Sequence, residues 1–321
     1  MINWGIIGCG DVTEIKSGPA FHKVPGSKLV AVMRRNAAKA EDYARRHGVA
    51  RWYADADELI HDAEVNAIYI ATPPSSHEAY TLAAIKAAKP VYVEKPMTVS
   101  YASAHNMTKA ANAANVKLTV AHYRRQWPLF QQLKSLLRQQ AIGDVRLVRL
   151  QFDQPPPTVT QLSDEKYVWR FDPAVSGGGL FHDLAPHQLD ILYYLFGTAN
   201  SVTGLATNQG SFYAAPDLIT GTIHFTNGIV FTGNWCFTAA VPNDVCEIIG
   251  SKGSLRFSFF NDNGITLQSN SQITRFDFDR LQHVQQPMIE EVVKYFSGNA
   301  PNPCSGEEGA EIMRWIGEMT K

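Results

Sequence analysis

Residues 4–12 read WGIIGCGDV, and this stretch decides the fold. The run from Ile2 to Ile7, which ends at the first glycine of the turn, is mostly apolar. Such a run is typical of a strand buried on both faces of a parallel sheet. Two glycines then flank a single residue, which predicts a tight turn followed by a helix. A glycine at the second position also leaves room for a pyrophosphate against backbone N–H groups. The predicted dinucleotide-binding turn consists of Gly8, Cys9, Gly10, Asp11 and Val12, with Thr13 where the fingerprint usually has glycine or alanine.

The first third of the chain alternates strands with helices. The pattern predicts further strands at 28–33, 66–71, 90–93 and 116–121, and helices at 37–47, 76–88 and 100–115. This alternation is typical of a doubly wound parallel sheet, whose ligand crevice lies outside the carboxyl ends of its strands. Ser17-Gly18-Pro19 interrupts the helix after the glycine turn, because proline has no N–H to donate. We therefore expect a reshaped loop there, with Lys16 near the pyrophosphate.

Beyond residue 122 the pattern becomes rich in strands. A helix at 127–140 is followed by predicted strands at 145–152, 201–206, 220–225, 229–235, 245–249 and 254–259. One helix at 183–196 interrupts them, and helices at 287–297 and 306–319 end the chain. The predicted fold is α/β: a Rossmann dinucleotide-binding domain at 1–122 with a doubly wound parallel sheet, then an α+β domain at 123–321 with a large, mostly antiparallel sheet.

Composition excludes several classes of protein. The 321 residues carry a net charge of −1, so we predict no nucleic-acid partner. No run reaches the roughly 20 apolar residues of a membrane span, so we predict no membrane partner. The four cysteines (Cys9, Cys236, Cys246 and Cys304) are scattered, which favours reduced thiols and a cytoplasmic location.

The end of the second strand predicts the cofactor. An acidic residue there would hold the ribose 2′-OH of NAD, but the strand ends in Arg34, Arg35 and Asn36. A guanidinium can bind a 2′-phosphate through two hydrogen bonds. The sequence therefore favours NADP, with NAD possible. The alternative is that both arginines are solvated surface charges.

Glu94-Lys95-Pro96 follows the strand at 90–93. Pro96 biases Lys95 toward extended backbone, which would direct its ammonium group into the crevice. An ammonium there can polarise a carbonyl or stabilise an alkoxide. The alternative is a solvated lysine at a strand end.

A second candidate stretch runs from Ser176 to His187. Its three glycines (Gly177, Gly178 and Gly179) permit unusual backbone and close approach of a ligand. Asp183 and His187 are four residues apart and share one helix face, so the histidine can relay a proton while the aspartate orients it or binds hydroxyls. The alternatives are an N-cap aspartate with a packing histidine, or a zinc site that includes His182. A nearby ammonium would oppose a bound cation, and we predict no metal.

Aromatic and amide groups further along are candidates to complete a substrate pocket, since tryptophan faces suit the C–H faces of sugars. The alternative for most of them is the core of the sheet. These candidates are Tyr123, Trp169, Arg170, Asn234 and Trp235.

Taken together, these motifs resemble the glucose–fructose oxidoreductase/inositol dehydrogenase (Gfo/Idh/MocA) family over nearly the whole chain. The resemblance rests on the glycine turn, Thr72-Pro73-Pro74 with His77, Glu94-Lys95-Pro96, Tyr123-Arg124-Arg125, Trp169-Arg170, the three glycines and Asp183-x3-His187. It implies hydride transfer between nicotinamide and a carbinol or carbonyl carbon of a sugar, polyol or diol. It implies catalytic roles for Lys95, His187 and Asp183. Thr72, Pro73, Pro74, His77 and Glu94 would lie beside the cofactor.

The sequence therefore predicts an NADP-favouring oxidoreductase that acts on CH–OH groups of a small molecule and forms a homodimer or higher homo-oligomer through the second-domain sheet. Two other functions stay open. One is a regulatory protein of the same fold that senses NADP or a sugar without chemistry. The other is a glycosidase that retains its nicotinamide.

Overall fold

The computed structural model describes residues 1–321, which divide into two compact units. The first unit comprises Met1–Arg124 and Leu281–Met313, and the second comprises Arg125–Arg280 and Arg314–Lys321. The sequence boundary after residue 122 did not anticipate that the chain returns to the first unit near its end. Apolar packing holds Leu281–Met313 in the first unit: the centroid of the Phe296 ring lies 5.5 Å from that of Trp4, which is fully buried.

The first unit contains a six-stranded sheet in the order β3-β2-β1-β4-β5-β6. Every strand pair in it is parallel, as the sequence predicted. β1 and β4 are the neighbours at which the strand order reverses, and sheets of this kind bind ligands at the carboxyl ends of such strands. The strands are β1 (Ile2–Ile7), β2 (Ser27–Met33), β3 (Arg51–Tyr53), β4 (Ala67–Ile70), β5 (Val91–Val93) and β6 (Leu118–Val120).

The helix after β1 is broken, as expected from Ser17-Gly18-Pro19. α1 ends at Ile15 and α2 begins at Ala20. Between them, a Cβ on Gly18 would lie 2.1 Å from the carbonyl oxygen of Thr13, so only glycine fits. The helices of this unit are α1 (Asp11–Ile15), α2 (Ala20–Lys23), α3 (Ala37–His47), α4 (Ala56–His61), η1 (Pro74–Ser76), α5 (His77–Lys86), α6 (Tyr101–Ala113) and α11 (Gln286–Phe296). Two more helices contain residues of both units: η2 (Tyr123–Gln126) and α12 (Gly306–Met319).

The second unit contains an eight-stranded sheet in the order β14-β13-β12-β11-β7-β10-β9-β8. Only β10 and β7 pair in parallel, which confirms the mostly antiparallel sheet. The strands are β7 (Val145–Asp153), β8 (Ala199–Thr207), β9 (Leu218–Phe225), β10 (Val230–Cys236), β11 (Asn243–Gly250), β12 (Gly253–Phe257), β13 (Gly264–Ser269) and β14 (Gln272–Asp277). The helices are α7 (Pro128–Arg138), α8 (Val159–Ser163), η3 (Val168–Arg170), α9 (Pro173–Ser176) and α10 (Gly179–Phe196).

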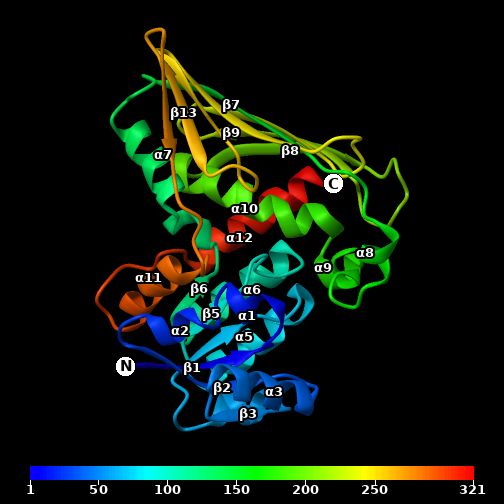
Figure 1. Ribbon diagram of the computed structural model, residues 1–321, viewed down its shortest axis with the longest axis vertical. Helices are drawn as coiled ribbons and strands as arrows, with labels where there is room; N and C mark the ends of the chain where they lie inside the picture. Colours follow the sequence, from blue (N-terminus) through cyan, green and yellow to red (C-terminus); the bar gives the residue numbers. More distant parts are fainter. The chain divides into compact units, whose positions relative to one another are not determined.

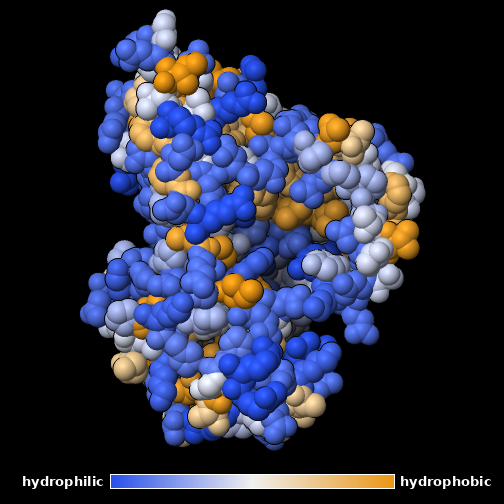
Figure 2. All heavy atoms as spheres, viewed as in Figure 1, coloured by the Kyte–Doolittle hydropathy of each residue, from blue (hydrophilic) through white to orange (hydrophobic).

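Helices cover only one face of this second sheet. Figure 1 shows α7 and α10 on the same side of it, and no helix on the other. The uncovered face carries exposed polar side chains, including Thr222, Thr232 and Asn234. None of the helices of the protein is long and apolar enough to cross a membrane. Figure 2 shows a largely hydrophilic surface on the face in view, with scattered apolar residues.

Candidate functional site

The glycine turn after β1 has the backbone that its sequence predicts. Gly8 has φ +94°, and a Cβ there would come within 2.6 Å of the Thr72 side chain at the end of β4. By contrast, a Cβ on Gly10 would meet only the Gly8 oxygen, at 4.0 Å. Packing within the protein therefore demands glycine at position 8 but not at position 10. Gly10 instead leaves its backbone open to an approaching group, which fits a dinucleotide.

Thr13 replaces the third glycine of the fingerprint without disturbing this turn. Its side chain is fully buried, and its hydroxyl donates to the carbonyl oxygen of Gly10 at 2.7 Å. Its own carbonyl oxygen accepts from the Tyr43 hydroxyl at 2.8 Å, which ties the turn to α3. Thr13 thus makes a hydrogen bond that glycine or alanine could not make.

Arg34 lies against the glycine turn, because its Nη1 donates to the carbonyl oxygen of Cys9 at 3.4 Å. Arg35 beside it is exposed. Burial raises the pKa of the Cys9 thiol to about 11, so Cys9 is a neutral thiol at pH 7. Arg46, the other nearby guanidinium, is engaged by Glu14 at 2.7 and 2.8 Å and holds the pKa of that carboxyl at about 2.

The segment after β4 is braced by a buried histidine. His77 is fully buried, with Nε2 at 2.7 Å from the oxygen of Thr72 and Nδ1 at 3.2 Å from those of Pro96 and Met97. Pro74 is also buried. In this arrangement His77 joins the end of β4 to the chain after β5, and any contribution to cofactor binding is through the backbone that it holds.

Lys95 is the second residue after the end of β5 at Val93, is half-buried, and precedes a cis peptide bond to Pro96. The neighbouring Glu94 is 5% exposed, and its carboxylate is engaged inside the protein. Oε1 accepts from Gln285 Nε2 at 2.5 Å and from the Tyr69 hydroxyl, and Oε2 accepts from the Lys95 backbone N–H at 3.2 Å. Glu94 therefore supports the backbone of Lys95. Sequence reasoning missed Gln285, since no motif marks it.

In the second unit, glycines shape the start of α10. Gly177, Gly178 and Gly179 all have positive φ values, of 91°, 157° and 74°. A Cβ on Gly178 would lie 2.3 Å from the His182 ring. These glycines are therefore needed by the protein itself, both for their backbone and for close packing.

Asp183 and His187 lie one turn apart within α10, whose N-cap is Gly178, so Asp183 is not an N-cap. Its Oδ2 accepts from Arg170 Nε at 3.1 Å, and the Arg170 guanidinium lies 4.6 Å from the Trp169 ring centroid. The structure thus brings together three of the predicted substrate-binding residues. Nowhere in residues 1–321 do three His, Cys, Asp or Glu side chains group as a metal site requires.

His187 is 6% exposed, and its ring lies 5.8 Å from that of Phe260, nearly perpendicular to it. Phe260 follows β12 and was not predicted, because nothing local distinguishes it from a core phenylalanine. Trp235 is fully buried and donates to Gln188 Oε1 at 2.6 Å, so it belongs to the sheet core. Asn234 is exposed on the opposite face, and Tyr123 is buried in the first unit.

Because His182, a second histidine of α10, is buried, we expect the free energy of unfolding to depend on pH. Burial lowers the pKa of His182 from 6.5 to about 4. The unfolded chain therefore binds this proton at a higher pH than the folded chain does, and stability falls as pH drops from 6.5 toward 4. We expect His182→Asn to remove up to about 3 kcal/mol of this pH dependence. Urea unfolding of the wild type and of His182→Asn at pH 7 and pH 4.5 tests this. If both proteins lost the same free energy of unfolding between these two pH values, the expectation would be contradicted.

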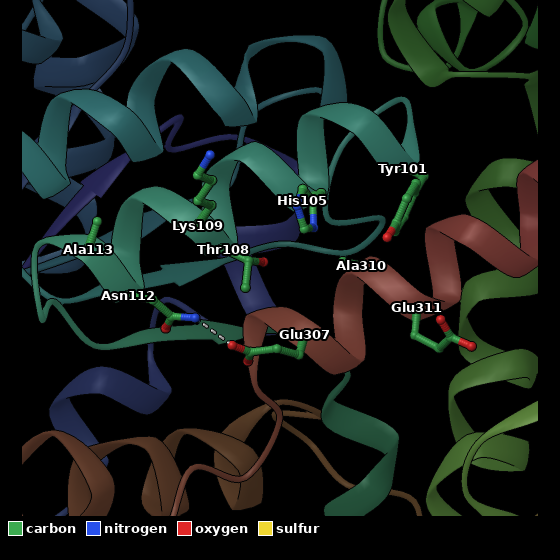
Figure 3. A pocket seen from close by; sticks show the side chains of 9 residues that line it. All are labelled: Tyr101, His105, Thr108, Lys109, Asn112, Ala113, Glu307, Ala310 and Glu311. Carbon is green, nitrogen blue, oxygen red and sulfur yellow. Dashed lines mark hydrogen bonds between the residues drawn. The ribbon is translucent and has the colours of Figure 1, made fainter.

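The first unit also has a groove between α6 and the start of α12, shown in Figure 3. Asn112 Nδ2 donates across it to Glu307 Oε1 at 2.8 Å. Its other lining residues are Tyr101, His105, Thr108, Lys109, Ala113, Ala310 and Glu311. None of the predicted catalytic or binding residues lines this groove.

Family models place the chain among known proteins. Residues 2–122 match the model described as "Oxidoreductase family, NAD-binding Rossmann fold", and residues 130–256 match the "GFO/IDH/MocA C-terminal domain". The chain belongs to the Gfo/Idh/MocA oxidoreductase family. This confirms the resemblance and the NAD-binding Rossmann fold of the first unit.

Relatives within the Gfo/Idh/MocA family span most of the chain. "Oxidoreductase P35" of Formosa agariphila is 45% identical over 311 residues, which cover 97% of this chain and 96% of that protein. The trans-1,2-dihydrobenzene-1,2-diol dehydrogenase of Oryctolagus cuniculus is 30% identical over 255 residues, covering 79% and 73%. A solved levoglucosan dehydrogenase in complex with NADH and levoglucosan has a TM-score of 0.88 at 21% identity, covering 99% and 95%, and shows the same fold.

Proposed function

We propose that this protein is an NADP-favouring oxidoreductase that acts on a CH–OH group of a sugar, polyol or diol. The observation that carries the proposal is the pair Asp183 and His187 on one face of α10, with Asp183 held by Arg170, in a chain of an NAD-binding oxidoreductase family. The names of relatives support the substrate class, since they include a dihydrodiol dehydrogenase and a levoglucosan dehydrogenase.

Each proposed catalytic residue has a chemical task. When bound, the nicotinamide supplies or accepts the hydride. Lys95 offers an ammonium group that polarises a carbonyl oxygen or stabilises an alkoxide. His187 gives a proton to a substrate oxygen in reduction, or takes it in oxidation. Asp183 accepts hydrogen bonds from substrate hydroxyls, with Arg170 fixing its carboxylate.

The proposed cofactor contacts divide into backbone and charged groups. Gly8 to Val12 would hold the pyrophosphate through their backbone, where Gly10 leaves room. Arg34 and Arg35 would bind the 2′-phosphate. Thr72, Pro73 and Pro74 would lie beside the cofactor, while His77 and Glu94 support their segments from within the protein.

The arginines make a testable difference between cofactors. We expect Arg34→Ala to raise the Kd for NADPH about 10- to 100-fold, because it removes a charged hydrogen-bond donor to the 2′-phosphate. The Kd for NADH should not change. Fluorescence titration of both cofactors tests this. Arg45→Ala is the matched control, since Arg45 is an exposed arginine of α3 paired with Asp42. An unchanged preference for NADPH in Arg34→Ala would exclude this role.

The substrate class is tested by turnover. NADPH and NADP consumption would be followed with a panel of ketoses, anhydro sugars, inositols and vicinal diols. We expect at least one class to be turned over. Tight NADPH binding without turnover of any compound would instead favour a sensor, and release of a reducing sugar without net NADPH formation would favour a glycosidase.

We also propose that the protein forms a homodimer or higher homo-oligomer through the helix-free face of the second sheet (Figure 1). That face presents hydroxyl and amide side chains, which can form hydrogen bonds across a symmetric interface. Sedimentation equilibrium tests this, and Thr232→Arg on β10 should shift the protein toward monomer. We further propose a cytoplasmic location, since all four cysteines are free thiols.

A further inference from the structure

Gln285 is a fully buried amide in the first unit, directly before α11. Both ends of its side chain are used. Its Nε2 donates to Glu94 Oε1 at 2.5 Å, across a separation of 191 residues, and its Oε1 accepts from the Tyr92 hydroxyl at 3.2 Å. A buried amide with both ends satisfied has one orientation, so it can fix its partners.

The same residue also holds the loop that follows the glycine turn. The Gln285 backbone N–H donates to the carbonyl oxygen of Lys16 at 3.1 Å. Two residues earlier, His283 Nδ1 lies 2.7 Å from the carbonyl oxygen of Ile15. The segment before α11 therefore fastens the loop created by the break between α1 and α2.

Tyr69 of β4 is a second donor to the Glu94 carboxylate. Its hydroxyl donates to Glu94 Oε1 and also lies 3.1 Å from Ser17 Oγ. The rings of Tyr69 and Tyr92 stack with centroids 5.2 Å apart, so two neighbouring buried phenols differ mainly in their hydrogen-bond partner. Tyr69 contacts the carboxylate, and Tyr92 contacts the amide of Gln285.

The contacts to Glu94 suit its ionised form. Gln285 Nε2, the Tyr69 hydroxyl and the Lys95 N–H are all donors, and only a carboxylate accepts at both oxygens without carrying a proton. Burial raises the pKa of Glu94, and the donors from Tyr69 and Gln285 oppose that rise. The titratable groups that face it are Tyr69 from β4, Tyr92 from β5 and Lys95 on its own segment.

We propose that Gln285 and Tyr69 are positioning residues for Lys95. They hold the Glu94 carboxylate ionised and fixed, so that its Oε2 accepts the Lys95 backbone N–H and sets the backbone from which the lysine side chain extends. The inference rests on the proposed role of Lys95 in catalysis. If it holds, the catalytic role of Lys95 also depends on Gln285, which lies 190 positions later in the chain.

Hydrogen exchange of the Lys95 amide tests this without substrate. Tyr69→Phe and Gln285→Met each remove a donor to Glu94 while keeping side-chain bulk. Tyr53→Phe is the matched control, since the Tyr53 hydroxyl donates to Asp62 Oδ2 at 3.0 Å in the same unit and not to Glu94 or Gln285. We expect the Lys95 amide to exchange about tenfold faster in the first two variants than in wild type. In Tyr53→Phe it should exchange as in wild type. Equal exchange in all four proteins would overturn the proposal, and Tyr69→Phe keeps the test available if Gln285→Met fails to fold.

The pH profile of turnover provides a second readout, using NADPH and the best substrate of the panel above. Loss of a donor raises the pKa of Glu94 further, so the acid limb of kcat should move to higher pH in Tyr69→Phe and Gln285→Met. Tyr53→Phe should keep the wild-type limb. Lys95→Met separates the two proposals: retained kcat in that variant would overturn the role of Lys95 and the positioning inference together. Lost kcat in Lys95→Met, with Tyr69→Phe matching Tyr53→Phe in exchange and pH profile, would overturn the positioning inference alone.

Discussion

His187→Asn should lower kcat by about 10²–10⁴-fold, the usual contribution of a positioned general acid or base. The asparagine keeps a polar group but cannot exchange a proton near neutral pH, so the substrate oxygen would lose its proton donor. The cofactor contacts proposed above come from the glycine turn, Arg34 and Arg35, and His187 is not among them. The Kd for NADPH should therefore stay at its wild-type value.

Steady-state kinetics and NADPH fluorescence titration would measure both quantities at pH 7. His182→Asn is the matched control, since it makes the same replacement at a buried histidine of the same helix. It should keep the wild-type kcat at this pH, where His182 is already neutral. A wild-type kcat in His187→Asn, on a substrate that the protein turns over, would remove His187 from the mechanism.

Asp190→Ala should destabilise the fold by about 3–5 kcal/mol, because it removes the carboxylate that neutralises a buried guanidinium. Arg125 and Asp190 are only 2% and 1% exposed. Arg125 Nη2 donates to Asp190 Oδ1 at 2.7 Å, and Arg125 Nε donates to both carboxylate oxygens at 3.0 and 3.1 Å. The pair joins the start of the second unit to α10, one turn beyond His187.

Urea unfolding at pH 7 measures this cost against two comparisons. Asp183→Ala also breaks an ion pair on α10, but its partner Arg170 is 28% exposed, so we expect a loss of only about 1 kcal/mol or less. The double variant Arg125→Met, Asp190→Leu removes both charges and should recover most of the stability that Asp190→Ala loses. A loss in Asp190→Ala no larger than that in Asp183→Ala would contradict this account.

Local signals in the sequence predicted most secondary structure. β1 was expected at Ile2–Ile7 and α3 at Ala37–His47, and both have these bounds. Gly48 ends α3 with φ 64°, because it adopts the left-handed conformation that other residues disfavour. The break at Gly18 was predictable for a similar reason, since a proline follows it directly.

Short or exposed elements escaped prediction. β3 has three residues, too few for a periodic pattern. In β14 nearly every side chain is exposed, so no alternation of apolar and polar residues marks it. The return of residues 281–313 to the first unit was also missed, because the apolar face of α11 does not specify which apolar surface it covers.

The sequence by itself determined the parallel and antiparallel sheets, the glycine turn after β1, and the shared helix face of Asp183 and His187. These features depend on residue periodicity, backbone freedom and spacing within a few turns of chain. Only the tertiary structure decided that His77 and Glu94 face inward, that Phe260 lies against His187, and that Gln285 contacts Glu94. Those contacts join residues that are distant in the chain, and hydrogen bonds across such distances form only after the sheets and helices have packed. The spacing of residues in the sequence therefore does not predict these contacts.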